Sequence, residues 1–374
     1  MSWEGKVATM MDKYIKGQED LTVRQNICLA FLKSLGRIVT NCNAEHAYFS
    51  VKKARPPVEA YAEAGVISFA PRALWDQAKL GWRGYIATDQ INYHETLENK
   101  GDVTIIKRSG VIMENLTEAV TDNFATDLYV DGNASGNTMK IHGFESFCGA
   151  DTTYDSTGAD VADLVAKPSD TYFDISTALG VDGSWTTGLT TKPNASVATD
   201  WPEGSGDSEY DYWSPKLVNW GSTSWGNSGA TWALNCVDSL RRTAQWLRLT
   251  NGAQAGSNLI CIMAGHMMSD FKGVQDSLKQ IALPHQKATD LGFPEVLNFE
   301  GLGLHTEFAV PVNTAYVWNF SKAELCSLAP KLLFRFGPTW VLEKLAYLYL
   351  VGFYGNLRVK SPKYFAKLYP YAVA

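Results

Sequence analysis

An amphipathic stripe over residues 101–131 constrains the fold more than any other part of the sequence. Its apolar side chains recur at steps of three and four residues, at Met113, Leu116, Val120, Phe124 and Leu128. This spacing places them on one face of an α-helix, and the run Asp131-Gly132-Asn133 is a helix stop signal. The sequence therefore predicts one long helix whose apolar face must pack against another part of the chain.

Extended structure is expected on both sides of the Pro56-Pro57 break. Residues 46–54 alternate partly between apolar and polar side chains. Residues 75–91 place Ala78, Leu80 and Trp82 on one face and Lys79 and Gly81 on the other. Two extended arms around such a bend predict a projecting hairpin. An isolated hairpin is marginally stable in water, so this one needs a surface to lie on.

The other segments predict a mixture of helices and strands. Residues 1–40 have the spacing of a helical arm, and residues 328–374 end in an aromatic run typical of β-structure. Between them, residues 228–320 resemble an α/β unit. Its expected helices cover 233–247 and 267–278, and its expected strands cover 259–264, 295–299, 307–312 and 315–320.

Charge is distributed unevenly along the chain. Residues 150–227 carry twelve acidic and three basic residues, a net charge of −9, whereas the rest of the chain has a net charge of +3. The first 40 residues carry +2 and the last 47 carry +6. An asymmetry of this size indicates that the acidic segment faces something different from the remainder. The overall charge of −6 does not indicate a sequence-specific nucleic-acid-binding protein.

The motifs of the common enzyme and cofactor classes are missing. Neither phosphate-cradling glycine loop occurs, and no nucleophile elbow is present. His94-Glu95 begins like a zinc-protease motif, but Glu98 stands where the second histidine is needed. The six cysteines lack zinc spacing, which predicts free thiols in a reducing cytoplasm. We therefore expect no catalysis, no metal and no cofactor.

Isolated residues of chemical interest have a simpler structural explanation. Cys261 and His266 could form a nucleophile and its base, but the apolar strand pattern around Cys261 favours a buried, inert thiol. The remaining single histidines, at 46, 142, 285 and 305, are expected to be structural. The acidic segment lacks the calcium-loop pattern. The longest apolar run, residues 345–354, is too short to span a membrane.

Two features leave alternatives open. Six tryptophans concentrate in or beside the acidic segment, at positions 185, 201, 213, 220, 225 and 232. They indicate either a surface that stacks on glycans or, as we favour, aromatic packing and subunit contacts. The basic C-terminal run is either a solvated face or a surface that faces phosphates.

The chain resembles the major capsid proteins of tailed bacteriophages, whose fold is shared with herpesvirus capsid proteins. The resemblance lies in the order of the expected elements and in four stretches of sequence. Residues 97–147 resemble the family's spine helix with its Asp-Gly turn and the entry to the next strand, GFESF. Residues 74–91, LWDQAKLGWRGYIATDQI, resemble the returning strand of its extended loop. Residues 209–225 and 355–372 resemble a tryptophan-rich segment and the terminal strands of its peripheral domain.

The resemblance implies an α+β fold in which one subunit contacts many copies of itself. The implied division is an N-terminal arm (1–43), an extended loop (44–91), a peripheral domain with the spine helix (92–149), the acidic insert (150–227), an axial domain (228–328) and a C-terminal return to the peripheral domain (329–374). Hexamers and pentamers would enclose double-stranded DNA in a closed icosahedral shell. The protein would assemble in the host cytoplasm and reside in the virion.

The resemblance also suggests site residues and partners. Expected inter-subunit contacts are Lys79, Trp82, Arg83, Tyr85, Arg358 and Tyr364, and expected DNA-facing residues are Lys6, Lys13, Lys360, Lys363 and Lys367. Lys79 lies in the kind of loop through which some capsids are cross-linked, but no residue pattern supports cross-linking. Further expected partners are a scaffolding protein, a portal and a decoration protein, with no membrane.

The charge distribution suggests an orientation, in which the insert faces outward and the arm and tail face the DNA.

The alternatives to a capsid subunit are a β-rich glycan-binding protein, an enzyme whose site converges only in the fold, and a tail-tube protein.

Overall fold

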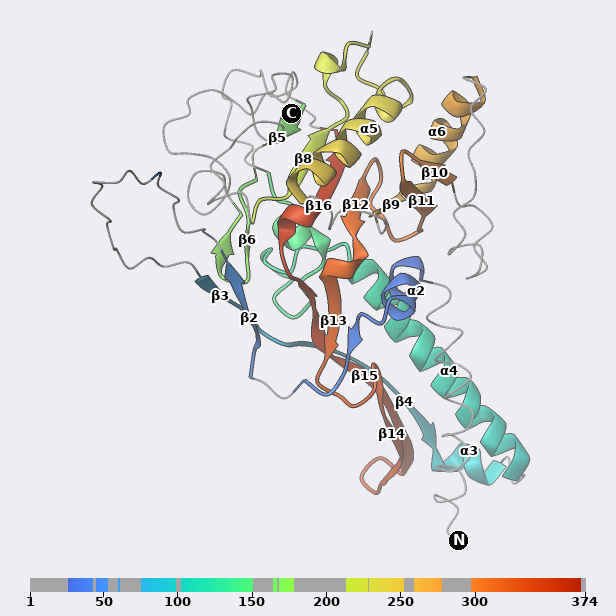
Figure 1. Cartoon of the computed structure of the whole chain (residues 1–374). Coiled ribbons are helices and arrows are strands. Elements are labelled where there is room, and N and C mark those ends of the chain that lie inside the picture. The colour runs from blue at the N-terminus through green and yellow to red at the C-terminus, as the bar shows by residue number, and fades with distance from the viewer. Residues whose placement is uncertain are drawn as a thin grey trace.

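A computed structural model describes residues 26–42, 45–52, 60, 75–98, 102–150, 164–166, 168–177, 213–227, 229–251, 259–277 and 297–370. Two larger sheets dominate this part of the chain, one of five strands and one of seven. Each has helices packed against it, and the five-stranded sheet extends with the longest helix toward one end of the molecule (Figure 1).

The long helix α4 (Asp102–Asp127) lies along the five-stranded sheet. All five apolar side chains of the predicted stripe are buried, which confirms the prediction of one long helix with a single packed face. Its outer part packs on strands β4 (Arg83–Asn92) and β15 (Ala346–Val359), where Ile112, Met113 and Leu116 meet Tyr349 and Val351.

Strand β15 organises this sheet. One of its edges pairs with β4, and its other edge pairs first with β14 (Phe334–Val341) and then with β13 (Ala323–Ser327). The short strand β1 (Ile38–Val39) adds to β13 in parallel. It follows helix α2 (Ile27–Ser34), whose residues 28–32 are buried. The remainder of the expected helical arm, residues 1–25, lies outside the described residues.

The seven-stranded sheet has the order β10-β11-β9-β12-β16-β8-β5. These strands are β10 (Leu297–Phe299), β11 (Leu302–Thr306), β9 (Leu259–Met263), β12 (Ala315–Asn319), β16 (Phe365–Tyr369), β8 (Lys216–Asn219) and β5 (Val165–Ala166). Helix α5 (Trp232–Asn251) packs on β8 and β16, and α6 (Gly265–Ser277) packs on β11. Because the two helices also contact each other, they cover one face of the sheet.

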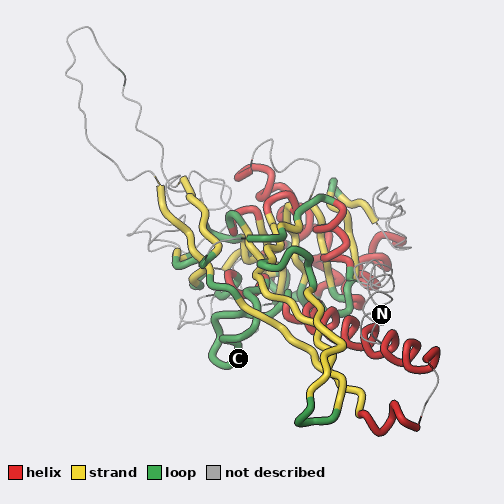
Figure 2. Tube along the Cα trace, turned by 90° about the horizontal axis from the view of Figure 1, so that it is seen from below, coloured by secondary structure: helices red, strands yellow, loops and turns green. Residues whose placement is uncertain are grey.

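The extended segment before α4 differs from the prediction in one respect. Strands β2 (Ala47–Lys52) and β3 (Trp75–Leu80) form an antiparallel pair, but the expected second arm over 75–91 is two strands rather than one. After Gly81 the chain leaves β2 and becomes β4, because β15 offers it a ten-residue partner. The β2–β3 pair lies at one end of the molecule and α3 (Tyr93–Glu98) at the other (Figure 2).

One further expectation needs correction. The expected strand over 307–312 is a loop, and the strand precedes it at Leu302–Thr306, where it pairs in parallel with β9. Pro311, which has no N–H to donate, is suited to this loop and not to a central strand. The C-terminal segment contributes strands to both sheets. Strands β14 and β15 belong to the five-stranded sheet, and β16 belongs to the seven-stranded sheet.

Smaller elements complete the described structure. Strands β6 (Thr171–Tyr172) and β7 (Ile175–Ser176) form a second two-stranded pair. Short 3-10 helices cover Phe144–Phe147, Thr223–Trp225, Phe320–Lys322 and Pro362–Tyr364. None of the helices among the described residues is long and apolar enough to cross a membrane.

Candidate functional site

A cluster of basic side chains surrounds Glu324 on the five-stranded sheet. Glu324 on β13 lies directly opposite Arg358 on β15 in the antiparallel register, and the two side chains form an ion pair. Arg37, which immediately precedes β1, places its Nη1 3.4 Å from Glu324 Oε1. Lys360, just after β15, places its Nζ 2.7 Å from the same oxygen. Three cations therefore converge on one carboxylate, one from the segment before β1 and two from β15 and the residue just after it.

The electrostatics of this cluster are dominated by positive charge. The Glu324 side chain is only 7% exposed. Although burial opposes ionisation, hydrogen bonds from Lys360 and Arg358 hold the pKa of Glu324 below its ordinary value. Burial lowers the pKa of neighbouring Lys322, and the charges of Lys360 and Arg37 lower it further. The carboxylate is thus firmly ionised, and it does not neutralise the cations around it.

An aromatic ring extends the cluster toward β16. The Nζ atoms of Lys322 and Lys363 lie 5.1 Å and 5.3 Å from the centre of the Tyr364 ring. Cations at this distance over an aromatic face are attracted to its negative quadrupole. Tyr364, Lys360, Lys363 and Arg358, which the sequence analysis selected, therefore lie together in the fold. Arg37 and Lys322 belong to the same group, and sequence reasoning missed them.

The remaining predicted DNA-facing residues lie elsewhere. The Lys367 Nζ is 2.6 Å from Glu145 Oε2 and 4.4 Å from the centre of the Tyr369 ring, and its side chain is 12% exposed. Glu145 also accepts a short hydrogen bond from the Tyr316 hydroxyl. Lys367 is therefore held by neighbours within its own chain. Lys6 and Lys13 lie outside the described residues.

The predicted contact residues of the extended segment are spread along β3 and β4. Lys79 pairs with Asp174 at 3.2 Å, and both side chains are more than half exposed. Trp82 and Arg83 are half-buried at the junction of the two strands. The Tyr85 hydroxyl accepts a hydrogen bond from the Ile141 amide at 2.8 Å, and burial raises the pKa of Tyr85. This hydrogen bond links β4 to the turn after α4.

An exposed apolar surface lies at the far end of the five-stranded sheet. We call it the apolar tip and define it as Tyr93 and Leu97 of α3 with Leu342 and Leu345 of the β14–β15 turn. Their exposed fractions are 44%, 47%, 74% and 55%. The Tyr93 amide donates to the Leu345 carbonyl at 2.8 Å, which joins α3 to the turn. Large apolar side chains exposed together in this way are typical of surfaces that bind another protein.

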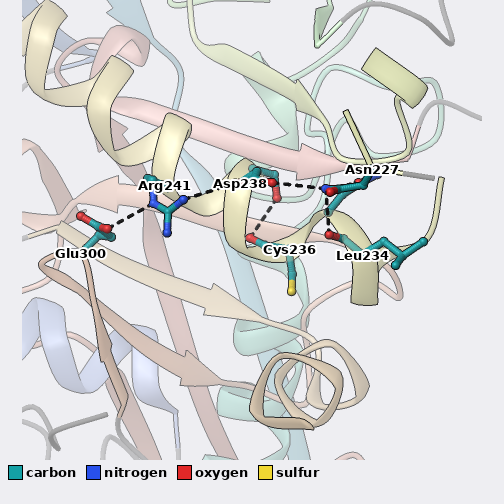
Figure 3. Close-up of polar contacts among 8 residues, drawn as sticks. Asn227, Leu234, Cys236, Asp238, Arg241 and Glu300 are labelled. Atoms are coloured by element: carbon teal, nitrogen blue, oxygen red, sulfur yellow. Dashed lines mark hydrogen bonds and ion pairs between the residues drawn. The ribbon is translucent and has the colours of Figure 1, made fainter. Parts of the chain in front are cut away.

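A polar network on α5 was also missed by sequence reasoning (Figure 3). Arg241 contacts Asp238 on its own helix and Glu300 in the β10–β11 turn, each at 3.3 Å. The Asn227 amide donates to Asp238 and to the Leu234 carbonyl. Because Arg241 and Glu300 are more than two-fifths exposed, their ion pair adds little stability. The network fixes the loops around α5.

The tryptophan cluster is a packing feature in the described part of the chain. Trp213, Trp220 and Trp232 are buried, and Trp225 is half-buried. Their indole N–H groups donate to the backbone carbonyls of Tyr172, Asn313, Met267 and Asn219 respectively. Three of these rings are therefore buried in the core and the fourth is partly covered, so together they do not form an open surface for stacking on a glycan. Trp185 and Trp201 lie outside the described residues.

The candidate catalytic pair is not arranged for catalysis. Cys261 is fully buried in β9, and burial raises the pKa of its thiol, so it is not a thiolate nucleophile. His266 is hydrogen-bonded through Nε2 to Asn313 at 2.8 Å. Burial, aided by the charge of Arg83, lowers the pKa of His142 to about 4. Among the described residues, no group of three or more metal-ligating side chains is placed to hold an ion.

Comparison with known proteins finds a similar fold in solved capsid structures. No family model and no curated protein matches the sequence. Solved structures match it well: the capsid of a native GTA particle covers 91% of this chain and 90% of its own, with a TM-score of 0.53 and 12% identity. The capsid of cyanophage A-1(L) covers 91% of this chain and 92% of its own, also with a TM-score of 0.53 and 12% identity.

The likeness at 12% identity concerns the fold, and it covers 91% of this chain. It bears out the fold class that the sequence predicted. The chain has the α+β fold of phage major capsid proteins.

Proposed function

We propose that this chain is a structural subunit that self-assembles into the protein shell of a phage-type particle that encloses double-stranded DNA. The observation that carries the proposal is the match of about nine-tenths of the chain to two capsid structures. Such a role is geometric and needs no catalytic site. The α+β framework would hold several contact surfaces at fixed positions, so that identical copies repeat the same contacts.

The described surfaces fit this role. The apolar tip exposes four large side chains on a rigid frame of α3 and the β14–β15 turn. A subunit that buried these side chains against a neighbour would gain roughly 25 cal/mol for each Å² of apolar area removed from water. We assign the tip, with α4, to the peripheral contacts between subunits, and the seven-stranded sheet to the axial domain around each capsomer centre.

The β2–β3 pair supplies a second contact in this proposal. Tyr48 and Trp75 on these strands are 42% and 60% exposed, and no further strand among the described residues pairs with the outer edges of β2 and β3. A neighbouring subunit would cover these edges, in the manner of strand addition. The outward orientation of the acidic insert belongs to the same proposal. Most of residues 150–227 lie outside the described part of the chain.

Expression of the full chain, alone and with the products of its neighbouring genes, tests the proposal. Sedimentation through sucrose followed by negative-stain imaging would detect the products. We expect rings, sheets with six-fold order or closed shells. A chain that stays a monomer or small oligomer in both conditions, at concentrations of tens of micromolar, would contradict a shell subunit. Co-expression separates a missing scaffolding partner from a true failure to assemble.

A further inference from the structure

The Glu324 cluster continues into a single basic patch. We define this basic patch as Arg37, Lys322, Arg358, Lys360 and Lys363, together with Tyr364. A chain of contacts connects its members. Arg37, Arg358 and Lys360 meet at Glu324, and the Lys360 amide donates to the Lys322 carbonyl at 3.0 Å. The Nζ atoms of Lys322 and Lys363 both lie over the Tyr364 ring.

Among the described residues, three cations of the patch, Arg37, Arg358 and Lys360, share the single carboxylate of Glu324, and Lys322 and Lys363 lie beside them. Like charges held this close repel one another, and the lowered pKa of Lys322 reflects that repulsion in addition to burial. Since Glu324 is already shared by three cations, the patch has a surplus of positive charge that a bound anion would offset. A surplus of this kind attracts polyanions through space.

The chemistry of the patch favours a phosphate backbone over a protein partner. Lysine ammonium groups and arginine forks are the groups that bind phosphate oxygens in nucleic-acid complexes. Lys360 is exposed, and Arg37, Lys322 and Lys363 are half-buried, so all four reach the surface. Protein contact surfaces have an apolar centre, which in this chain is found at the apolar tip.

We propose that the basic patch binds the phosphate backbone of duplex DNA without reading its sequence, with Lys322, Lys360 and Lys363 as the contacting residues. The inference rests on the proposed function, because that function supplies the enclosed DNA. It also revises the residues expected from the sequence. Lys322 is added to the contacting residues. Lys367 is removed because its side chain is only 12% exposed beside Glu145, whereas the paired Lys360 side chain is 44% exposed.

Fluorescence anisotropy with a labelled 30-base-pair duplex of mixed sequence tests the patch. The full-length chain would be compared with the triple variant Lys322→Gln/Lys360→Gln/Lys363→Gln at several salt concentrations. The slope of log K against log salt is negative, and each lost phosphate contact reduces its magnitude by about 0.9. The slope of the triple variant should therefore be less steep by about 2 to 3. At 100 mM salt we expect its affinity to fall by about tenfold or more.

Two further variants control for net charge and for side-chain chemistry. Lys52→Gln/Lys272→Gln/Lys344→Gln removes the same charge from β2, α6 and the β14–β15 turn, and it should bind the duplex as the unchanged chain does. Lys322→Arg/Lys360→Arg/Lys363→Arg keeps the charge and should retain binding. Circular dichroism and thermal unfolding would show that all three variants fold.

The outcomes separate this inference from the proposed function. Equal loss of binding in the patch variant and the charge-matched control would overturn the inference, as would unchanged binding in the patch variant. Loss of assembly with unchanged DNA binding would also overturn it and make the patch a subunit contact. If the chain forms no shells but the patch variant alone loses DNA binding, the shell function fails and the DNA-binding patch stands.

Discussion

The buried carboxylate of Glu307 accepts a hydrogen bond from the Tyr129 hydroxyl at 3.0 Å. The same oxygen accepts a hydrogen bond from the Cys28 amide at 3.3 Å. Tyr129 lies just after α4, Cys28 lies in α2 and Glu307 directly follows β11. One carboxylate thus joins the N-terminal helix, the end of the long helix and the seven-stranded sheet. Burial raises the pKa of Glu307 to about 7, although both hydrogen bonds lower it.

The free energy of unfolding should therefore fall as the pH rises and Glu307 ionises. An unfolded glutamate has a pKa of about 4.3, so between about pH 4.3 and 7 the folded chain binds the extra proton. The contribution of Glu307 is fully present below this window, declines as the pH rises through it and is constant above. Relative to Glu307→Gln, the free energy of unfolding of the unchanged chain should drop by about 3 kcal/mol between pH 4 and pH 8.

Urea unfolding of both proteins at pH 4, 6 and 8 measures this difference. Glutamine has nearly the same shape and keeps an oxygen for Tyr129 and Cys28. Other titrating groups, including His142, are present in both proteins and cancel in the comparison. A difference in unfolding free energy that does not change with pH would show that Glu307 does not titrate in this window.

The buried side chain of Asn356 is a second point at which distant segments are joined by hydrogen bonds. It connects β15, the turn after α4 and the base of the extended segment. Its Oδ1 accepts hydrogen bonds from the His142 and Leu357 amides at 2.9 Å, and its Nδ2 donates to the Gly81 carbonyl at 2.8 Å. Asn356→Ala should lower the free energy of unfolding by about 2 to 4 kcal/mol, because buried partners lose their hydrogen bonds.

Asn356→Asp distinguishes lost hydrogen bonds from lost volume. Aspartate keeps the oxygen acceptors, but when ionised it cannot donate to Gly81 and it buries a charge. We expect it to be less stable than the unchanged chain at pH 7 and to recover part of the loss near pH 4, where a protonated carboxyl can donate. Thermal unfolding at the two pH values measures this, and an equal loss at both would contradict the assignment.

Gly143 allows a close approach between the segment after the turn and the end of α4. A Cβ at this position would lie 2.6 Å from the Asp127 carbonyl oxygen and would also press on the Leu128 carbonyl. Gly143→Ala should therefore destabilise the fold by about 1 to 3 kcal/mol through overpacking. Gly273→Ala is the matched control, since a Cβ in that part of α6 meets no atom within 4 Å and alanine favours the helix.

Denaturant midpoints of the two glycine variants should move in opposite directions. Gly143→Ala should unfold at lower denaturant and Gly273→Ala at equal or higher denaturant. Equal stability of both variants would mean that the backbone around Gly143 moves aside without cost.

The sequence predicted the framework well because local periodicity determined it. The five-residue stripe of α4 is buried as expected, and the Asp131-Gly132 signal lies just beyond the helix end at Asp127. Apolar runs likewise located β9 and β12. The expected strand over 307–312 was wrong, because pairing with β9 places the strand at Leu302–Thr306 and a single sequence carries no information on that partner.

The candidate site was only partly predictable because charge partners lie far apart in the chain. Lys367 and Glu145 are separated by 222 positions, and Arg37 and Glu324 by 287. The sequence shows the basic C-terminal run but not which of its cations are already paired. Lys322 and Arg37 lie outside that run, and they reach it only because β1 pairs with β13 and β13 pairs with β15.

The apolar tip yields the last prediction, which separates assembly from folding. Leu345 has a φ of 46°, a left-handed conformation that asparagine tolerates better than leucine, and Leu342 is 74% exposed. The variant Leu342→Glu/Leu345→Asn should therefore keep or slightly raise the unfolding temperature of the subunit. Its assembled fraction in sedimentation should fall at least severalfold, because the proposed interface would bury a charge and lose two apolar side chains.

Met139→Glu is the control for this variant, because Met139 is an exposed apolar residue, at 79%, in the turn-rich segment after α4. We expect it to assemble as the unchanged chain does. If the tip variant assembled normally while folding normally, the tip would not be a subunit contact, and the peripheral contacts would have to involve other faces of α4 and the five-stranded sheet. If the Met139 variant failed equally, the effect would come from added negative charge rather than from the tip.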